Sequence, residues 1–243
     1  MTADLRKLWQ EAFDEPEDFT DLFFTKGFSP DRYHCIRENG VPVSALYWFD
    51  CYLGEQKLAY IYGVATLKTH QGKGLAGKLL RETHNILQAQ GYAGTILVPA
   101  SQSLFGFYEK CGYRTATFTT KLTCNAADTP VAIRKISAEE YVRLRPAFLP
   151  EGSILQGSEA LAFLQGYCDF YAGEDFLLVC SRSPEGFRGQ ELLGNAQAAP
   201  GILRAFNCAE GCFRTPGTDR PFAMWLPLQA NCHKPAWFAL ALD

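Results

Sequence analysis

The residues between positions 61 and 80 are the ones whose types and spacing could do chemistry. An apolar segment, residues 61–66, runs into a loop that contains Gly72, Gly74 and Gly77, and this loop opens an amphipathic helix. Glycines let backbone N–H groups approach a ligand closely, and such groups together with a helix N-terminus bind phosphate. We therefore expect this loop to bind a phosphate-bearing ligand.

The three glycines also spell the G-x-G-x-x-G pattern of a dinucleotide-binding loop. That site needs an acidic residue about 20 positions onward, at the end of the next strand, to bind a ribose. The next predicted strand, residues 95–98, instead runs into Pro99-Ala-Ser-Gln-Ser103. Residues 67–71 also separate the first strand from the glycines. The sequence therefore disfavours a dinucleotide site, and it contains no G-x-x-x-x-G-K-[ST] pattern.

The same loop is similar to that of the GCN5-related N-acetyltransferase (GNAT) family, because Gln71-x-x-Gly74-x-Ala76 matches the family signature Q/R-x-x-G-x-G/A. A second segment, residues 104–113, resembles the family's short helix with a tyrosine before a lysine and a glycine turn. The resemblance covers roughly residues 3–124. It is strongest to the branch with a second, degenerate acetyltransferase-like half, as in the enhanced-intracellular-survival proteins.

This resemblance implies that acetyl-CoA binds as a cosubstrate. Tyr108 takes the position of the general acid that protonates the departing thiolate, and the alternative role is packing. Ser103 either contacts the pantetheine arm or caps the short helix, and His70 is either a phosphate contact or a surface residue. The strand end that would pair with pantetheine is Val64, Ala65 and Thr66. The pyrophosphate loop is Gln71, Gly72, Lys73, Gly74, Leu75, Ala76, Gly77 and Lys78.

The residues leave the general base and the acetyl acceptor open. The candidate bases are Asp50, Glu55, Tyr62, a water molecule and the carboxylate of Asp243. No Cys–His pair stands near the motifs, so direct attack by a primary amine is favoured over a covalent relay through Cys111. An acidic group between the first two helices could attract that amine or simply be solvated: Asp14, Glu15, Glu17, Asp18 and Asp21. The alternative to an enzyme is a CoA-binding sensor or scaffold.

Composition limits the partners. The net charge of −3 and the absence of a basic run argue against nucleic acid. No apolar run reaches membrane-spanning length, and the N-terminus has no apolar signal region, so we expect a soluble, cytoplasmic protein. Nine scattered cysteines indicate free thiols in a reducing compartment. Cys208, Cys212, Cys232 and His233 have spacings unlike those of structural zinc sites, so we expect no metal. Association with further copies of the chain is left open.

Hydrophobic periodicity and turn residues predict a mixed α/β fold with two halves. The first, residues 1–124, would be the acetyl-CoA-binding domain. The second, residues 131–243, would be an acetyltransferase-like domain without a cofactor motif, joined by a linker at 125–130. The helices expected are 3–13, 17–24, 74–90, 103–110, 137–144 and 158–171. The strands expected are 34–37, 41–52, 58–66, 95–98, 114–123, 175–181, 201–207 and 221–228.

Overall fold

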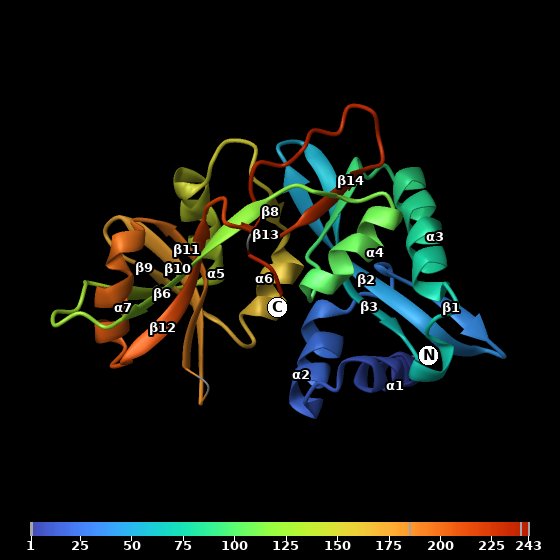
Figure 1. The fold of residues 1–243 in the computed structure, drawn as a ribbon, viewed down its shortest axis with the longest axis horizontal. Helices are drawn as coiled ribbons and strands as arrows, with labels where there is room; N and C mark the ends of the chain where they lie inside the picture. The colour runs from blue at the N-terminus through green and yellow to red at the C-terminus, as the bar shows by residue number, and fades with distance from the viewer. Residues whose placement is uncertain (1, 185, 239, 243) are drawn as a thin grey trace. The chain divides into compact units, whose positions relative to one another are not determined.

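The computed structural model describes residues 2–184, 186–238 and 240–242. The chain divides into two compact units, each built from segments that are far apart in the sequence (Figure 1). The first unit contains Met1–Arg114, Leu155–Phe163 and Met224–Lys234, and the second contains Thr115–Ile154, Leu164–Ala223 and Pro235–Asp243. The sequence placed one boundary near residues 124–131, whereas in the structure the chain crosses between the units several times.

The first unit contains a mixed sheet with helices on both of its faces. Its elements are α1 (Thr2–Phe13), α2 (Glu17–Leu22) with a π-helical turn (Phe23–Gly27), β1 (Tyr33–Glu38), β2 (Val41–Leu53), β3 (Gln56–Thr66), a 3-10 turn (Lys68–His70), α3 (Leu75–Ala89), β4 (Gly94–Leu97), a 3-10 turn (Gln102–Leu104), α4 (Phe105–Lys110), β5 (Arg114–Thr115), β8 (Leu155–Gln156), α6 (Ser158–Leu164) and β14 (Met224–Pro227). The sheet order is β1-β2-β3-β4-β14-β5, with β8 paired to β2.

Strand β2 forms the centre of this unit because it is buried on both faces, from Pro42 to Phe49. On one face Leu46 and Trp48 pack in a cluster with Leu79 and Leu80 of α3. On the other face Tyr47 lies against Trp9 of α1, with ring centroids 5.5 Å apart. Helices α1 and α3 therefore cover opposite faces, as successive strand side chains point to opposite sides.

The second unit contains another mixed sheet. Its elements are β6 (Phe118–Asn125), β7 (Arg134–Ile136), α5 (Ala138–Leu144) with a 3-10 turn (Arg145–Phe148), β9 (Asp169–Ala172), β10 (Phe176–Ser183), β11 (Gly186–Gly194), a 3-10 turn (Ala196–Ala198), α7 (Ala199–Ala205), β12 (Glu210–Pro216) and β13 (Arg220–Pro221). The order is β13-β6-β12-β11-β10-β9-β7. The parallel pair β11–β12 is joined through α7, in the same way as the parallel pair β3–β4 is joined through α3.

Several predicted elements are present at nearly the predicted positions. The hairpin between β1 and β2 turns at Asn39 and Gly40, which both have positive φ. Ser137 caps α5, since the backbone N–H of Glu140 donates to its hydroxyl, whereas the Glu140 carboxylate pairs with Arg134 rather than completing a capping box. The apolar tail is docked, because Phe238 is fully buried.

Other predicted elements are wrong, for reasons that the local sequence does not show. Residues 201–207 were expected to be a strand but lie in α7, because Pro200 starts the helix and Ile202 and Leu203 face the core. The helix expected over 158–171 ends at Leu164, and β9 follows. The expected linker belongs to the second unit, since the backbone N–H of Ala126 donates to Ala209.

The strand expected over 114–123 is also broken in two. Its first part, β5, belongs to the sheet of the first unit, and its second part, β6, belongs to the sheet of the second. Strand β14 was expected within the second half, near a sheet edge, but it pairs with β4 along Met224–Leu97 in the first unit. Figure 1 shows this red strand among the blue and green elements of the first unit. Among the described helices, none is long and apolar enough to cross a membrane.

Candidate active site

Strands β3 and β4 pair over a short distance and then separate. Their parallel pairing runs from Leu58–Gly94 to Tyr60–Ile96, whereas β3 continues to Thr66 with β2 on its other edge. In the described part of the chain, the edge of β3 beyond Tyr60 therefore has backbone groups that β4 does not use. An extended ligand arm can add to such an edge as another strand would. The predicted pantetheine residues Val64, Ala65 and Thr66 lie on this segment.

A β-bulge lies within the same segment. Ala45 pairs with Ala65, and Tyr47 pairs with Tyr62, so β3 has one residue more than β2 between these pairs. Gly63 lies in the bulge with a φ of 60°, and a Cβ there would be 2.4 Å from Trp9 Cζ3. The bulge therefore requires glycine, and bulges of this kind redirect the following residues of a strand.

The glycine loop presents an open helix N-terminus. Gly72 and Gly74 have φ values of 75° and 76°, a conformation that is costly for other residues. Gly74 is the N-cap of α3, and no side chain caps this helix. A Cβ on Gly72 or Gly74 would meet no atom within 4 Å, so these residues border open space. At Gly77, by contrast, φ is not positive, so the backbone conformation does not require glycine there. The loop fits a phosphate, because the first N–H groups of α3 have no side-chain acceptor.

Polar side chains tie this loop to the sheet. The Gln71 amide donates to the carbonyl oxygen of Thr66 at 3.3 Å, which closes the loop onto the end of β3. His70 Nε2 lies 3.2 Å from Glu38, and its Nδ1 lies 2.8 Å from the Thr69 hydroxyl. Both ring nitrogens of His70 thus have partners within the chain. Lys78 lies 3.8 Å from Glu82 at the exposed surface, whereas Lys73 has no ion pair among the described residues.

Tyr108 lies on α4 and is buried in the core cluster that α3 shares. Its ring packs in the cluster that contains Leu79 and Leu80, and it contacts Tyr113 edge to face at 5.9 Å. The side chain is 8% exposed, and burial raises its pKa to about 12, with a smaller contribution from Cys111. Its hydroxyl forms no hydrogen bond to any residue that the structure describes. Tyr108 is therefore a protonated phenol with a proton to donate.

Ser103 does not cap the short helix. It lies in the 3-10 turn Gln102–Leu104, and its hydroxyl is 2.8 Å from the hydroxyl of Ser101. Helix α4 begins at Phe105, its N-cap residue is Leu104, and no side chain caps it. The capping alternative is therefore wrong, and a contact with the pantetheine arm stays a prediction.

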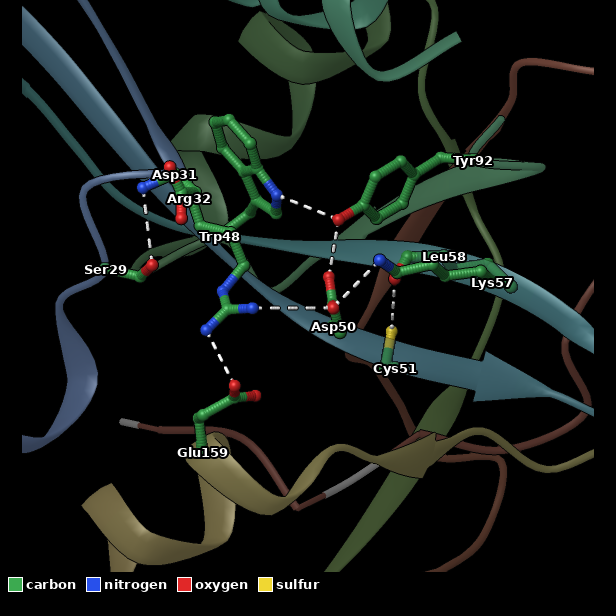
Figure 2. Close-up of polar contacts among 10 residues, drawn as sticks. All are labelled: Ser29, Asp31, Arg32, Trp48, Asp50, Cys51, Lys57, Leu58, Tyr92 and Glu159. Carbon is green, nitrogen blue, oxygen red and sulfur yellow. Dashed lines mark hydrogen bonds and ion pairs between the residues drawn. The ribbon is translucent and has the colours of Figure 1, made fainter. Parts of the chain in front are cut away.

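Asp50 is surrounded by donors and cations (Figure 2). Tyr92 donates its hydroxyl to Asp50 Oδ1 at 2.5 Å, Lys57 Nζ lies 2.9 Å from Oδ2, and Arg32 Nη1 lies 3.6 Å from Oδ2. Burial and then the hydrogen bond to Asp50 raise the pKa of Tyr92, which keeps its proton on the phenol. Both oxygens of the Asp50 carboxylate thus have partners within the chain. Asp50 therefore holds β2, β3 and the segment before β4 together.

The other candidate bases lie in different parts of the fold. Glu55 lies in the β2–β3 turn, at the far end of β3 from Thr66, and ten residues of strand span about 33 Å. Glu55 is therefore distant from the glycine loop, and its role as the base stays a prediction. Tyr62 lies in an aromatic cluster with Trp9 and Phe23. Asp243 lies outside the described residues. Of the acidic group, Asp21 forms an ion pair with Arg6.

A buried polar chain that the sequence did not indicate includes Tyr113, whose ring contacts Tyr108. Thr95 Oγ1 donates to the Tyr113 hydroxyl at 3.0 Å, and this hydroxyl lies 2.9 Å from His84 Nε2. We assign the Tyr113 proton to His84, whose ring then carries its own proton on Nδ1. Burial lowers the pKa of His84 to about 4, so the ring is neutral. The only signal in the sequence was a histidine on the apolar face of α3.

We expect this histidine to make the protein sensitive to acid. Its pKa in the folded state is below the ordinary value of 6.5, so its stabilising effect is present above pH 6.5 and is lost as the pH falls through about 4. The loss amounts to about 3 kcal/mol in the free energy of unfolding. The free energy of unfolding, measured with urea, should therefore fall less over this pH range in His84→Gln than in the wild type. His233→Gln, which removes an exposed imidazole, is the control, and equal pH dependence in all three proteins would contradict the prediction.

The separated strands, the bulge and the uncapped helix after a glycine loop define an α/β domain with a candidate phosphate site. Residues 2–116 match the family model of the acetyltransferase (GNAT) domain, so this part of the chain belongs to the GNAT family. This family uses acetyl-CoA as the acetyl donor. A comparison with curated proteins gives no match.

Solved structures with the same fold extend over both units. A GCN5-related N-acetyltransferase from Anabaena variabilis superimposes with a TM-score of 0.72 at 14% identity, over 94% of this chain and 70% of that one. Eis1 from Mycobacterium abscessus has a TM-score of 0.66 at 12% identity, over 93% and 71%. A tandem GNAT protein from the clavulanic acid biosynthesis pathway has a TM-score of 0.56 at 9% identity, over 95% of each chain. The two-half GNAT fold is therefore shown.

The two units differ at the position of the phosphate loop. Helix α3 begins after an uncapped glycine, whereas α7 follows a 3-10 turn that Asn195 caps through its bond from the Gln197 N–H. Pro200 also removes one N–H from the first turn of α7. The second unit thus repeats the β–α–β arrangement without an open N-terminus, as expected for a half without a cofactor motif.

Proposed function

We propose that this protein transfers an acetyl group from acetyl-CoA to a primary amine by direct attack. The observation that carries the proposal is the joining of the open α3 N-terminus to the unpaired edge of β3. The α3 N-terminus offers N–H groups and Lys73 to a pyrophosphate. The β3 edge offers backbone groups of Val64, Ala65 and Thr66 to an extended arm. A single ligand with a phosphate end and a peptide-like arm uses both.

Acetyl-CoA supplies a thioester, and the chain supplies the groups that act on it. The amine nitrogen bonds to the acetyl carbon, the carbon–sulfur bond breaks, and the electron pair goes to sulfur. Tyr108 is the proposed donor to this sulfur, since its hydroxyl is protonated and without a partner in the described part of the chain. The base that removes the amine proton is not assigned to a residue.

A covalent relay through Cys111 has less support. Burial raises the pKa of its thiol, although the charge of Arg81 opposes this effect. A thiol with a raised pKa carries little thiolate at neutral pH and is a poor nucleophile. Direct attack is therefore the mechanism that we propose.

A non-catalytic CoA sensor or scaffold is the second candidate. It shares the loop and the β3 edge with the enzyme, and it differs in having no use for a buried, protonated Tyr108. A buried phenol without a hydrogen-bond partner among the described residues favours the enzyme.

Calorimetric titration with acetyl-CoA tests the binding site. We expect saturable binding by the wild type and no binding of NADH. Gly74→Ala strains the left-handed backbone by about 1–2 kcal/mol, so we expect affinity for acetyl-CoA to fall by about tenfold. Gly91→Ala is the matched control, because Gly91 has a φ of 83° and equally open surroundings but follows the other end of α3. Equal affinity in both variants, or no binding by the wild type, would count against the proposal.

A further inference from the structure

A cavity of about 500 Å³ lies on the sheet of the second unit. Strands β6, β10, β11, β12 and β13 contribute to its wall. Its described lining contains the four basic residues Lys121, Arg188, Arg214 and Arg220 and no Asp or Glu. This volume is within the range of about 300–1,000 Å³ that is typical of small-molecule sites.

Strand register places three of these cations on one face. Lys121 and Arg214 are directly opposite each other on β6 and β12, and Arg188 of β11 is opposite Cys212, two residues before Arg214. Their neighbours along the strands, such as Phe187 and Phe213, belong to the cluster that packs on α7. Because side chains alternate across a sheet, the basic residues lie on the face away from α7.

Lys121 and Arg214 repel each other across the paired strands, and a bound anion would offset this repulsion. Like charges directly opposite each other on paired strands repel. Over the residues that the structure describes, Lys121, Arg188 and Arg220 form no ion pair. Two nearby carboxylates that the structure describes have other partners: Asp219 accepts from the Thr120 hydroxyl at 2.7 Å, and Glu191 is bound to Arg145. The positive charge is local, since the chain as a whole carries −3.

The cavity wall also holds Arg214 in place and adds hydrogen-bond donors beside the basic residues. The Arg214 guanidinium lies over the ring of Phe222, 4.4 Å from its centroid, and donates to the carbonyl oxygen of Gln190 at 3.4 Å. Both contacts limit its movement, so less conformational entropy is lost when a ligand binds. Hydroxyl groups from Ser181 and Thr119 line the same cavity and can donate further hydrogen bonds.

We propose that this cavity binds a small anion that carries two or more phosphoryl or carboxylate groups. Guanidinium groups form bidentate hydrogen bonds with either kind of group, and several cations around one cavity match several negative groups on one ligand. This site is separate from the acetyl-CoA loop, since all of its described lining residues belong to the second unit.

The test is calorimetric titration of the full chain at low ionic strength, with inorganic pyrophosphate and with tricarballylate as separate probes. We expect saturable binding of at least one probe. Arg188→Gln and Lys121→Gln change exposed side chains, and each should weaken binding by about tenfold. Arg204→Gln, on α7, makes the same charge change on the other face of the sheet and should leave the affinity unchanged. Preference for one probe identifies the ligand as a phosphate or as a carboxylate.

Three results would overturn this inference. The first is the absence of binding by both probes into the millimolar range. The second is an equal loss in Arg204→Gln and Arg188→Gln, which would indicate attraction to net charge alone. The third is binding that is lost in Lys73→Gln but retained in Arg188→Gln, because the probe would then be bound at the glycine loop of the first unit.

Discussion

We expect Tyr108→Phe to lower the turnover number by about a hundredfold, with little change in the affinity for acetyl-CoA. The variant keeps the ring that packs beside Leu79 and Leu80 and removes only the hydroxyl. The expected loss is at the lower end of general acid catalysis for a physical reason. A phenol with a pKa of about 12 is a weaker acid than an ordinary thiol, so its main effect is to stabilise the developing charge on sulfur through a hydrogen bond.

Steady-state kinetics with a responsive amine, combined with calorimetric affinities, measures this effect. Tyr113→Phe is the matched control, because it removes a neighbouring buried phenol that already has partners in Thr95 and His84. We expect the control to lose about 1 kcal/mol of stability and to keep most of its turnover. Unchanged turnover in Tyr108→Phe would remove this residue from the mechanism. The high pKa also predicts that Tyr108 causes no loss of activity with rising pH below about 12.

The largest effect on stability should come from Arg145→Met in the second unit. Arg145 donates through Nε and Nη2 to the two oxygens of Glu191 at 2.7 and 2.8 Å, and Tyr141 donates to the same carboxylate at 2.5 Å. Both charged side chains are almost fully buried, at 3% and 0% exposure. Removing the guanidinium leaves a buried carboxylate with one donor fewer and no opposite charge. We expect the free energy of unfolding to fall by about 3–5 kcal/mol.

Denaturant unfolding of the second unit, followed by a probe within it, checks this prediction. Arg143→Met is the control, because Arg143 is 75% exposed and should change stability by less than about 0.5 kcal/mol. The double variant Arg145→Met/Glu191→Leu should recover much of the lost stability, since no unpaired charge remains. A single variant as stable as the wild type would show that the carboxylate takes up a proton or water at little cost.

Local signals were sufficient where one segment carries all the information. Gly72 and Gly74 indicate a left-handed loop before a helix, and the structure has positive φ at both. The turn at Asn39 and Gly40 and the N-cap at Ser137 likewise depend on residues a few positions apart. These features are correct because turns and caps are decided by short-range hydrogen bonds and backbone preferences.

Long-range pairing was not accessible from the sequence. Strand β14 pairs with β4 across more than 120 positions, and no local pattern distinguishes that partner from one in the second unit. The lining of the basic cavity shows the same limit. Lys121, Arg188, Arg214 and Arg220 stand far apart in a chain without a basic run, and only the strand register gathers them.

The sequence by itself determined the family of residues 2–116, the glycine loop and the position of Tyr108 in a short helix, because each depends on neighbouring residues. Only the tertiary structure decided which of the candidate groups are protonated, have partners or lie near the loop. Burial keeps Tyr108 protonated, three partners surround Asp50, and the length of β3 separates Glu55 from the glycine loop. Protonation state and access depend on atoms that the fold brings together from distant positions, and neither can be obtained from the order of residues alone.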